Sequence, residues 1–371
     1  MSTPAPIDLD ALGDTPRIVV VVRDHMSGVL YSVPALRALK RRWPGARITL
    51  VTNSYSAPIL AAGTPYTDRI LPLFNFADEP SALDRIHDLR NKATTWLRLV
   101  GRVDLVVHLR HVGGGTLAFC AGLGRPKQVG YTQGGRFDRF LDVDLGWADN
   151  ELGSRQRNRI ILEGLGIEPD GDHLELWLRD DDRAWSRSWL AAHGHQDGTP
   201  VTVIHPGCHW GCNQWLADRW ADTANRILEE RGGSVVITGV AREKPLAERI
   251  LAGVDPTHRD RVLDATGATS LGQFAAMIGA ADLVVAVDAA PTQICQALDV
   301  PAVVLMGAGN PAWNGPVAGE RMVMLQEWDN DDPRPEICDW SSGACNGPNC
   351  STRLEDITVT QVLDNVDRLL G

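Results

Sequence analysis

The chain has 371 residues, a formal net charge of −11 and 7 cysteines. Its length exceeds what one ordinary hydrophobic core holds and predicts two domains, while the acidic balance argues against a nucleic-acid-binding surface spread over the molecule. We therefore expect a small-molecule partner whose anionic groups are met by local side chains and backbone N–H groups. No apolar run approaches the roughly 18 residues of a membrane span, and the few, odd-numbered cysteines fit a reducing compartment, so a cytoplasmic protein is expected.

The first half of the chain alternates strand and helix patterns. The apolar run 17–22 predicts a buried strand, 23–28 a loop at its carboxyl end, and the apolar spacing of 31–42 a helix. The same criteria predict strands at 47–52, 70–74, 105–109 and 128–131 and helices at 81–99 and 154–164. This succession is typical of βαβ units around a parallel sheet.

The second half repeats this rhythm after a polar stretch, and we place the domain boundary at Thr199, giving domains 1–198 and 199–371. Strands are expected at 201–204, 234–238, 261–265, 283–287 and 302–306, and helices at 218–231, 244–251, 270–279, 293–298 and 358–370. The predicted fold class is α/β, with two doubly wound parallel sheets and a C-terminal helix.

The segment 281–316 has the pattern of a β–turn–α–β unit. Asp288 follows its first strand directly, and the small residues Ala289 and Ala290 lead into a helix. In open α/β sheets ligands bind beyond the carboxyl ends of the strands, and a helix start suits a phosphate or diphosphate. The alternative is a tight crossover without a ligand, with Thr292 near the helix cap.

Polar residues also follow two strands of the first half. Arg23, Asp24 and His25 come after the first strand, and Arg110 and His111 come after the run 105–109. The basic loop 125–145, which contains Arg136, has two open interpretations: a contact for an anionic or hydroxyl-rich acceptor, or plain surface.

Several segments together resemble glycosyltransferase family 9, the heptosyltransferase family. They are VVVVRDHMSGVLYSVPALRALKRRWPGARITLVT, HPGCHW with a second Trp five residues later, the turn at Gly239, DATGATSLGQFAAMIGAADLVVAVDAAP and ALDVPAVVLMGAGNP. The resemblance covers nearly the whole chain. It implies a GT-B fold, in which two facing Rossmann-like domains hold the acceptor and a nucleotide-sugar donor, and inverting transfer to a hydroxyl without a metal. No cofactor is implied beyond the nucleotide-sugar co-substrate, which is ADP-heptose in the family's usual case.

The resemblance also implies site residues. The His205–Gly207 turn and Trp210 would lie beside the phosphates, Asp288 and its turn near the donor, and Glu243 near the nucleoside. The expected donor-binding residues are His205, Gly207, Cys208, His209, Trp210, Asn213, Gly239, Glu243, Asp288, Ala289, Ala290 and Gln293, and the expected acceptor-binding residues are Arg23, Arg110, His111 and Arg136.

Three positions depart from the family pattern. The family usually has a Gly-Asp pair before the first helix, whose Asp is the candidate base, but the stretch reads Ser27-Gly28-Val29 here, so that Asp is deleted or replaced. The usual Lys before the second Trp is Asn213, and the usual Asp-Ser/Thr-Gly turn with a following His is Asp288-Ala289-Ala290 with Gln293.

Inverting transfer needs a base for the acceptor hydroxyl, and we expect Asp24 or His25 to serve. The acceptor could be a saccharide, a natural product or a protein side chain. A nucleotide-sugar-binding protein that lost transfer and a GT-B sugar-nucleotide epimerase are the alternatives.

Three cysteines near the end of the chain could ligate a metal. Cys338, Cys345 and Cys350 lie in a loop rich in Gly, Asn and Pro, and with a fourth ligand they could hold Zn or Fe. Their spacing contains no CxxC pair, so we expect no metal site there. The cysteines would then be free thiols or form a disulfide.

Overall fold

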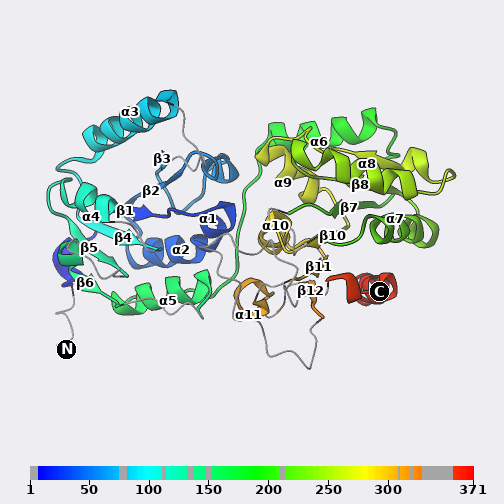
Figure 1. The fold of residues 1–371 in the computed structure, drawn as a ribbon. Helices are drawn as coiled ribbons and strands as arrows, with labels where there is room; N and C mark the ends of the chain where they lie inside the picture. The colour runs from blue at the N-terminus through cyan, green and yellow to red at the C-terminus, as the bar shows by residue number, and fades with distance from the viewer. Residues whose placement is uncertain are drawn as a thin grey trace. The chain divides into compact units, whose positions relative to one another are not determined.

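The computed structural model describes residues 7–74, 82–110, 114–131, 138–146, 152–208, 214–307, 310–317, 319, 321–327 and 354–371. Its internal contacts divide the chain into two compact units, Met1–Trp177 and Leu178–Gly371. Each unit contains one six-stranded sheet with helices on its two faces (Figure 1). The α/β fold class expected from the sequence is confirmed.

The first sheet is entirely parallel and has the strand order β3-β2-β1-β4-β5-β6. Its strands are β1 (Arg17–Val21), β2 (Arg47–Asn53), β3 (Arg69–Phe74), β4 (Leu105–His108), β5 (Lys127–Gly130) and β6 (Val143–Asp144). The order reverses direction between β1 and β4, which makes this pair the topological switch point, where ligands bind in open α/β sheets.

Two layers of helices cover this sheet. Its helices are α1 (Met26–Tyr31), α2 (Val33–Arg42), α3 (Ala82–Leu99), α4 (Gly114–Ala121) and α5 (Ser154–Gly164). One face packs Val19, Val21 and Val106 against α3 and α4, while α1, α2 and α5 contact one another on the other face (Figure 1). The continuous apolar runs of the central strands follow from this burial on both faces.

The helix expected over 31–42 begins earlier and is divided in two. Met26 to Gly28, expected in a loop, form the first turn of α1, and the helix is interrupted at Ser32 before α2. Pro34 explains the interruption, because proline has no N–H to continue the helical ladder and is tolerated only in a first turn. The expectation of a loop through Gly28 was therefore wrong.

The second sheet is also parallel and has the strand order β12-β11-β10-β7-β8-β9. Its strands are β7 (Val201–His205), β8 (Ser234–Ile237), β9 (Val262–Asp264), β10 (Leu283–Val287), β11 (Ala302–Leu305) and β12 (Met322–Leu325). Counted from the first strand of each unit, the two orders are the same. The second parallel sheet expected from the sequence is confirmed, and its switch point lies between β7 and β10.

Helices again cover both faces of the second sheet. They are α6 (Asp180–Ala192), α7 (Ala217–Arg231), α8 (Lys244–Gly253), α9 (Leu271–Gly279), α10 (Ala290–Leu298), α11 (Pro311–Asn314) and α12 (Val359–Leu370). Trp220, Ile250 and Val362 join α7, α8 and α12 in one core, and α9 contacts both α6 and α10 (Figure 1). Val362 and Val366 on the last helix are fully buried.

The contacts divide the chain after Trp177, ahead of the boundary expected at Thr199. Helix α6 is the reason. It packs against α9 of the second unit, with the Ser186 hydroxyl 3.7 Å from the sulfur of Met277. The polar stretch before Thr199 is therefore an outer helix of the second unit and not a linker.

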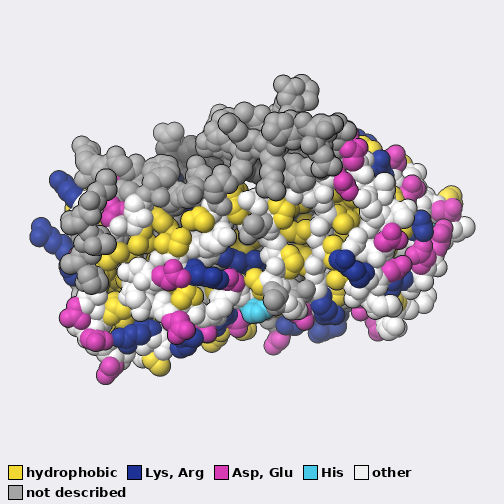
Figure 2. Space-filling model, turned by 90° about the horizontal axis from the view of Figure 1, so that it is seen from below, with side chains coloured by type: hydrophobic (Ala, Val, Ile, Leu, Met, Phe, Trp, Pro, Cys, Tyr) yellow, Lys and Arg dark blue, Asp and Glu magenta, His cyan; other side chains and the backbone are white. Residues whose placement is uncertain are grey.

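Within the described part of the chain, no helix combines the length and apolarity that crossing a bilayer requires. On the face shown in Figure 2, basic and acidic side chains are interspersed.

Candidate active site

The ends of β1 and β4 lie level with each other at the first switch point. Val21 pairs with His108, so the residues that follow these two strands emerge side by side at the carboxyl edge of the sheet. Asp24 and Arg110 are among them. The sequence placed both residues at strand ends, and the structure brings them into contact.

The main chain of Asp24 is anchored to the end of β2. Its carbonyl oxygen accepts hydrogen bonds from the Asn53 side-chain amide and, over 3.3 Å, from the Ser56 hydroxyl. The Asn53 side-chain oxygen in turn accepts the Ser56 N–H at 2.6 Å. Buried polar groups that are paired in this way hold the loop after β1 in one conformation.

The Asp24 carboxylate is buried, although it is a charged group. It accepts hydrogen bonds from the His25 backbone N–H (2.7 Å) and from the Arg110 guanidinium, with which it forms an ion pair. The Arg110 side chain remains 37% exposed, whereas that of Asp24 is 8% exposed. The carboxylate of Asp24 is therefore buried, and the guanidinium of Arg110 beside it is partly open to solvent.

The other residues expected at this edge lie at the surface or outside the described residues. Arg23 and His25 are exposed, and the His25 backbone forms the N-cap of α1. His111 and Arg136 lie outside the described residues. Of the two candidate bases, Asp24 is thus the buried one and His25 the solvent-facing one.

His108, the last residue of β4, is a buried neutral group under this site. Its Nε2 lies 2.9 Å from the Gln128 side-chain oxygen, which fixes Nε2–H as the donor, and its Nδ1 has no partner among the described residues. Burial lowers the pKa of His108 to about 4. It therefore supplies no positive charge at neutral pH.

In the second unit, Asp288 lies directly beyond β10, whose Ala286 pairs with His205 of β7. The Asn314 amide donates to both carboxylate oxygens of Asp288, at 3.2 and 3.5 Å. Burial raises the pKa of Asp288 to about 6, and the Asn314 hydrogen bonds offset this only in part. At a pH near 6 this carboxyl group can therefore hold a proton and donate it in a hydrogen bond.

His205 ends β7 and is buried against Phe274, with ring centroids 5.3 Å apart. Its Nδ1 lies 3.0 Å from the Thr238 hydroxyl, which donates its one hydrogen to the Ile204 carbonyl at 3.2 Å. The hydroxyl therefore accepts from His205 Nδ1–H, and Nε2 keeps a lone pair. Burial lowers the pKa of His205 to about 4, so this ring is neutral and offers an acceptor.

Glu243 closes the turn after β8. Its carboxylate accepts the Val240 N–H at 2.8 Å and lies against two glycines. A Cβ on Gly207 would be 2.2 Å from the Glu243 carboxyl carbon, and one on Gly239 would be 2.7 Å from its Oε2. Three residues expected at the donor site are thus brought together, and the two glycines make room for the carboxylate.

The expected turn Ala289-Ala290 differs slightly from the observed one, because α10 begins at Ala290. Ala289 and Cys208 pack against the core of the second unit, and Gln293 is buried. Next to Gln293, the Thr292 hydroxyl is buried with no partner among the described residues.

Several expected residues lie outside the described residues. They are the donor-site residues His209, Trp210 and Asn213 and the cysteines Cys338, Cys345 and Cys350. Among the residues that are described, no group of three or more His, Cys, Asp or Glu side chains is arranged to hold a metal ion.

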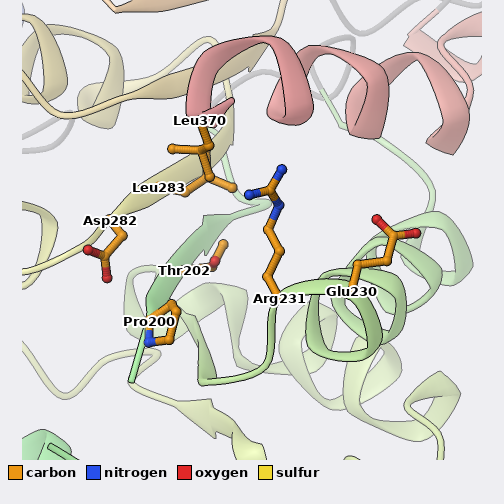
Figure 3. A pocket seen from close by; sticks show the side chains of 7 residues that line it. All are labelled: Pro200, Thr202, Glu230, Arg231, Asp282, Leu283 and Leu370. Carbon is orange, nitrogen blue, oxygen red and sulfur yellow. The ribbon is translucent and has the colours of Figure 1, made fainter. Parts of the chain in front are cut away.

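One cavity of about 350 Å³ lies away from these strand ends. Figure 3 shows it at the opposite edge of the second sheet, beside the first residues of β7 and β10 and the end of α12. Its polar groups are used internally: Arg231 pairs with Asp367 at 2.6 Å, and Asp282 accepts the Val201 N–H at 2.8 Å. This cavity lies between α7, α12 and the amino ends of the strands, away from the residues expected to bind the donor.

Four residues that complete these sites were not expected from the sequence: Asn53, Gln128, Thr238 and Asn314. Asn53 and Thr238 directly follow apolar runs, so the strand-end rule applied throughout would have found them. Asn314 lies in α11, and no local pattern links it to Asp288.

Comparison with known proteins identifies the family. The family model described as glycosyltransferase family 9 (heptosyltransferase) matches residues 122–336. Lipopolysaccharide heptosyltransferase 1 of Pseudomonas aeruginosa is 34% identical over 309 residues, which are 81% of this chain and 81% of that protein. Lipopolysaccharide heptosyltransferase 2 of Salmonella typhimurium is 27% identical over 316 residues, 83% of this chain and 87% of that protein.

Solved structures share the fold. The family 9 glycosyltransferase of Veillonella parvula superposes with a TM-score of 0.79 at 21% identity, covering 96% of this chain and 97% of that one. The E. coli heptosyltransferase WaaC with ADP-2-deoxy-2-fluoro heptose superposes with a TM-score of 0.64 at 17% identity, covering 95% and 99%. The chain therefore belongs to glycosyltransferase family 9, the heptosyltransferase family, and is a glycosyltransferase with the GT-B fold.

Proposed function

We propose that this protein transfers a heptose from an ADP-linked donor to a hydroxyl group of a lipopolysaccharide core saccharide, with inversion and without a metal. Two relatives named lipopolysaccharide heptosyltransferase support the sugar and the acceptor class, and the WaaC structure with an ADP-heptose analogue supports the donor. The observation that carries the proposal is the buried Asp24 carboxylate at the carboxyl end of β1.

Asp24 is the base in this proposal. Its carboxylate takes the proton of the acceptor hydroxyl while the acceptor oxygen forms a bond to the anomeric carbon of the sugar. The bond from that carbon to the diphosphate oxygen breaks, and its electron pair leaves with ADP. Arg110 holds the carboxylate in place, and the anchored loop fixes its position, which is the preorganisation that general-base catalysis requires.

The second unit holds the donor in this proposal. The start of α10 offers a positive dipole end to the diphosphate, and Asp288 can carry a proton near pH 6, which reduces its repulsion of the phosphates. Glu243 has one carboxylate oxygen on Val240, which leaves the other for a ribose hydroxyl or the base. His205 contributes through the backbone of its turn, because its ring is neutral.

The decisive experiment measures ADP release from ADP-heptose by the purified protein, with and without lipopolysaccharide core acceptor. We expect acceptor-dependent release that survives EDTA and falls by a factor of about 10²–10⁴ in Asp24→Asn. His25→Ala is the matched variant for the alternative base and should retain most turnover.

Three outcomes would contradict the proposal. Donor binding without release indicates a binding protein, and conversion of the donor into another sugar nucleotide indicates an epimerase. Equal turnover of Asp24→Asn and the native protein would remove Asp24 as the base.

A further inference from the structure

The Asp24 carboxylate lies where a side chain at position 28 would begin. A Cβ built on Gly28 would be 1.9 Å from Asp24 Oδ2, 2.2 Å from Cγ and 2.4 Å from Cβ. Real Cβ contacts do not occur at these separations, and the overlap reaches the Cβ of Asp24 itself. Any side chain at position 28 must therefore displace the whole Asp24 side chain.

The local backbone does not require this glycine. Gly28 lies inside α1 and is not among the residues with positive φ. A helix favours alanine over glycine, so the sequence at this position gives up helix propensity. The contact with Asp24 is the feature of the described structure that requires the missing Cβ.

The Asp24 side chain is held from its other sides as well. Its main-chain carbonyl accepts from Asn53 and Ser56, its Oδ1 accepts the His25 N–H, and its Oδ2 pairs with Arg110. The main-chain bonds fix where the side chain begins, and a shift of the carboxylate away from α1 would break its bonds to the His25 N–H and to Arg110. The Asp24 carboxylate is thus enclosed by Gly28 of α1, the His25 N–H and Arg110, and we call this position the seat of the carboxylate.

We infer that Gly28 is a positioning residue, whose missing side chain seats the Asp24 carboxylate against helix α1 in the orientation in which it takes the acceptor proton. This inference rests on the proposed role of Asp24. It also means that a carboxylate can enter the same space from two directions, either from the loop after β1, as here, or from position 28 on the helix.

The first test replaces Gly28 by alanine. Gly28→Ala should lower kcat by a factor of about 10 or more with little change in KM for ADP-heptose, and it should lower Tm by about 2–8 °C because of overpacking. Gly115→Ala is the matched control, since Gly115 is also helical and a Cβ there meets nothing within 4 Å. That control should keep native kcat and Tm.

The second test is a double-mutant cycle. In an Asp24→Gly background, Gly28→Ala should not lower kcat or Tm further, because the carboxylate and the Cβ that it would overlap are both gone. Gly28→Asp in the same background should raise kcat at least tenfold over Asp24→Gly, by supplying a carboxylate to the same space. Equal losses from Gly28→Ala in both backgrounds would indicate a role unrelated to Asp24 and would overturn the inference.

The outcomes separate this inference from the proposed function. Native turnover in Asp24→Asn contradicts only the assignment of Asp24 as the base. The positioning role of Gly28 is then tested by the Tm values of the double-mutant cycle, which do not depend on activity. A crystal structure of Gly28→Ala with the Asp24 carboxylate unmoved would overturn the seat itself. If Gly28→Ala fails to fold, folding of the Asp24→Gly/Gly28→Ala protein supports the inference and its failure to fold overturns it.

Discussion

The two units share one strand order but treat the carboxylates at their switch points differently. Asp24 beside β1 has a cation, Arg110, as its partner, whereas Asp288 beside β10 has the neutral amide of Asn314. Burial raises the pKa of Asp288 to about 6, and the hydrogen bonds from Asn314 oppose this rise only in part. The comparison teaches that the same topology delivers a carboxylate to the ligand edge of each sheet, while residues distant in the chain decide which partner that carboxylate meets.

Other devices recur in both units. Each buries a neutral histidine at the end of a central strand, His108 in the first and His205 in the second. Each also places a carboxylate over a glycine, Asp24 over Gly28 and Glu243 over Gly207. The two units thus share a buried neutral histidine and a carboxylate packed on a glycine. They differ in the charge of the group that contacts the carboxylate at the switch point.

The largest expected effect is acid destabilisation through the two histidines. Both are held neutral with a pKa of about 4 against an ordinary value of 6.5, so the folded state binds fewer protons than the unfolded state. The contribution of these histidines to the free energy of unfolding is therefore fully present above pH 6.5. It is lost as the pH falls toward 4, by up to about 3 kcal/mol for each histidine.

Urea unfolding at pH 7, 5.5 and 4.5 measures this loss, and it should fall on both units alike. His108→Leu should reduce the pH dependence of the first unit and His205→Leu that of the second. His193→Leu at an exposed position is the control and should leave the dependence unchanged. An unaltered pH dependence in both buried variants would contradict the prediction.

The same substitution should have opposite signs in the two units. Asp24→Asn weakens the pairing with Arg110 and should cost about 1–2 kcal/mol of unfolding free energy at pH 7. Asp288→Asn removes a carboxylate that is ionised at a cost and should add about 1–2 kcal/mol at pH 7.

The pH dependence checks the second sign. The folded-state pKa of Asp288 is raised, so the native protein loses stability as the pH rises from about 4 to about 6. The gain from Asp288→Asn should therefore disappear near pH 4. Denaturant unfolding of both variants at pH 4.5 and 7 provides the data, and equal signs at pH 7 would show that the two environments are alike.

Gly207→Ala should displace Glu243 as Gly28→Ala displaces Asp24. Because a Cβ there overlaps the Glu243 carboxyl carbon, we expect about a tenfold loss of ADP affinity, measured by calorimetry. In a Glu243→Ala background the same change should cost much less. A tenfold loss in both backgrounds would mean that the turn backbone and not Glu243 is responsible.

The smallest effect concerns the partners of the buried histidines. Thr238→Val leaves the His205 Nδ1–H without its acceptor, and Gln128→Leu does the same to the His108 Nε2–H. Each should lower the free energy of unfolding by about 1 kcal/mol in urea titrations at pH 7, where both rings are neutral. Thr94→Val, at an exposed helix position, is the control. Loss in one unit only would show that the two histidines are not equivalent.

Much of this architecture could be read from local patterns. The apolar runs that became β7, β10 and β11 were expected almost to the residue, because strands buried on both faces leave an uninterrupted signal. Asp24 and Asp288 were expected at the ligand edge for the same reason, since each follows such a run. The start of α1 was missed, although Pro34 marked the interruption.

The partners at the sites could not be read in this way. Asp24 and Arg110 are 86 residues apart, and Asp288 and Asn314 are 26 apart. Helix α6 likewise had no local sign that it packs on α9. These contacts exist only after the strands have taken their order in the sheet.

By itself the sequence determined two parallel sheets, the family and the strand ends that carry polar groups, because hydrophobic periodicity and motif spacing are properties of neighbouring residues. Only the tertiary structure decided that Asp24 is paired with a cation, that Asp288 accepts from the amide of Asn314, and that Gly28 makes room for a carboxylate. Protonation and side-chain placement depend on burial and on groups distant in the chain, and both arise from the packing of the folded units.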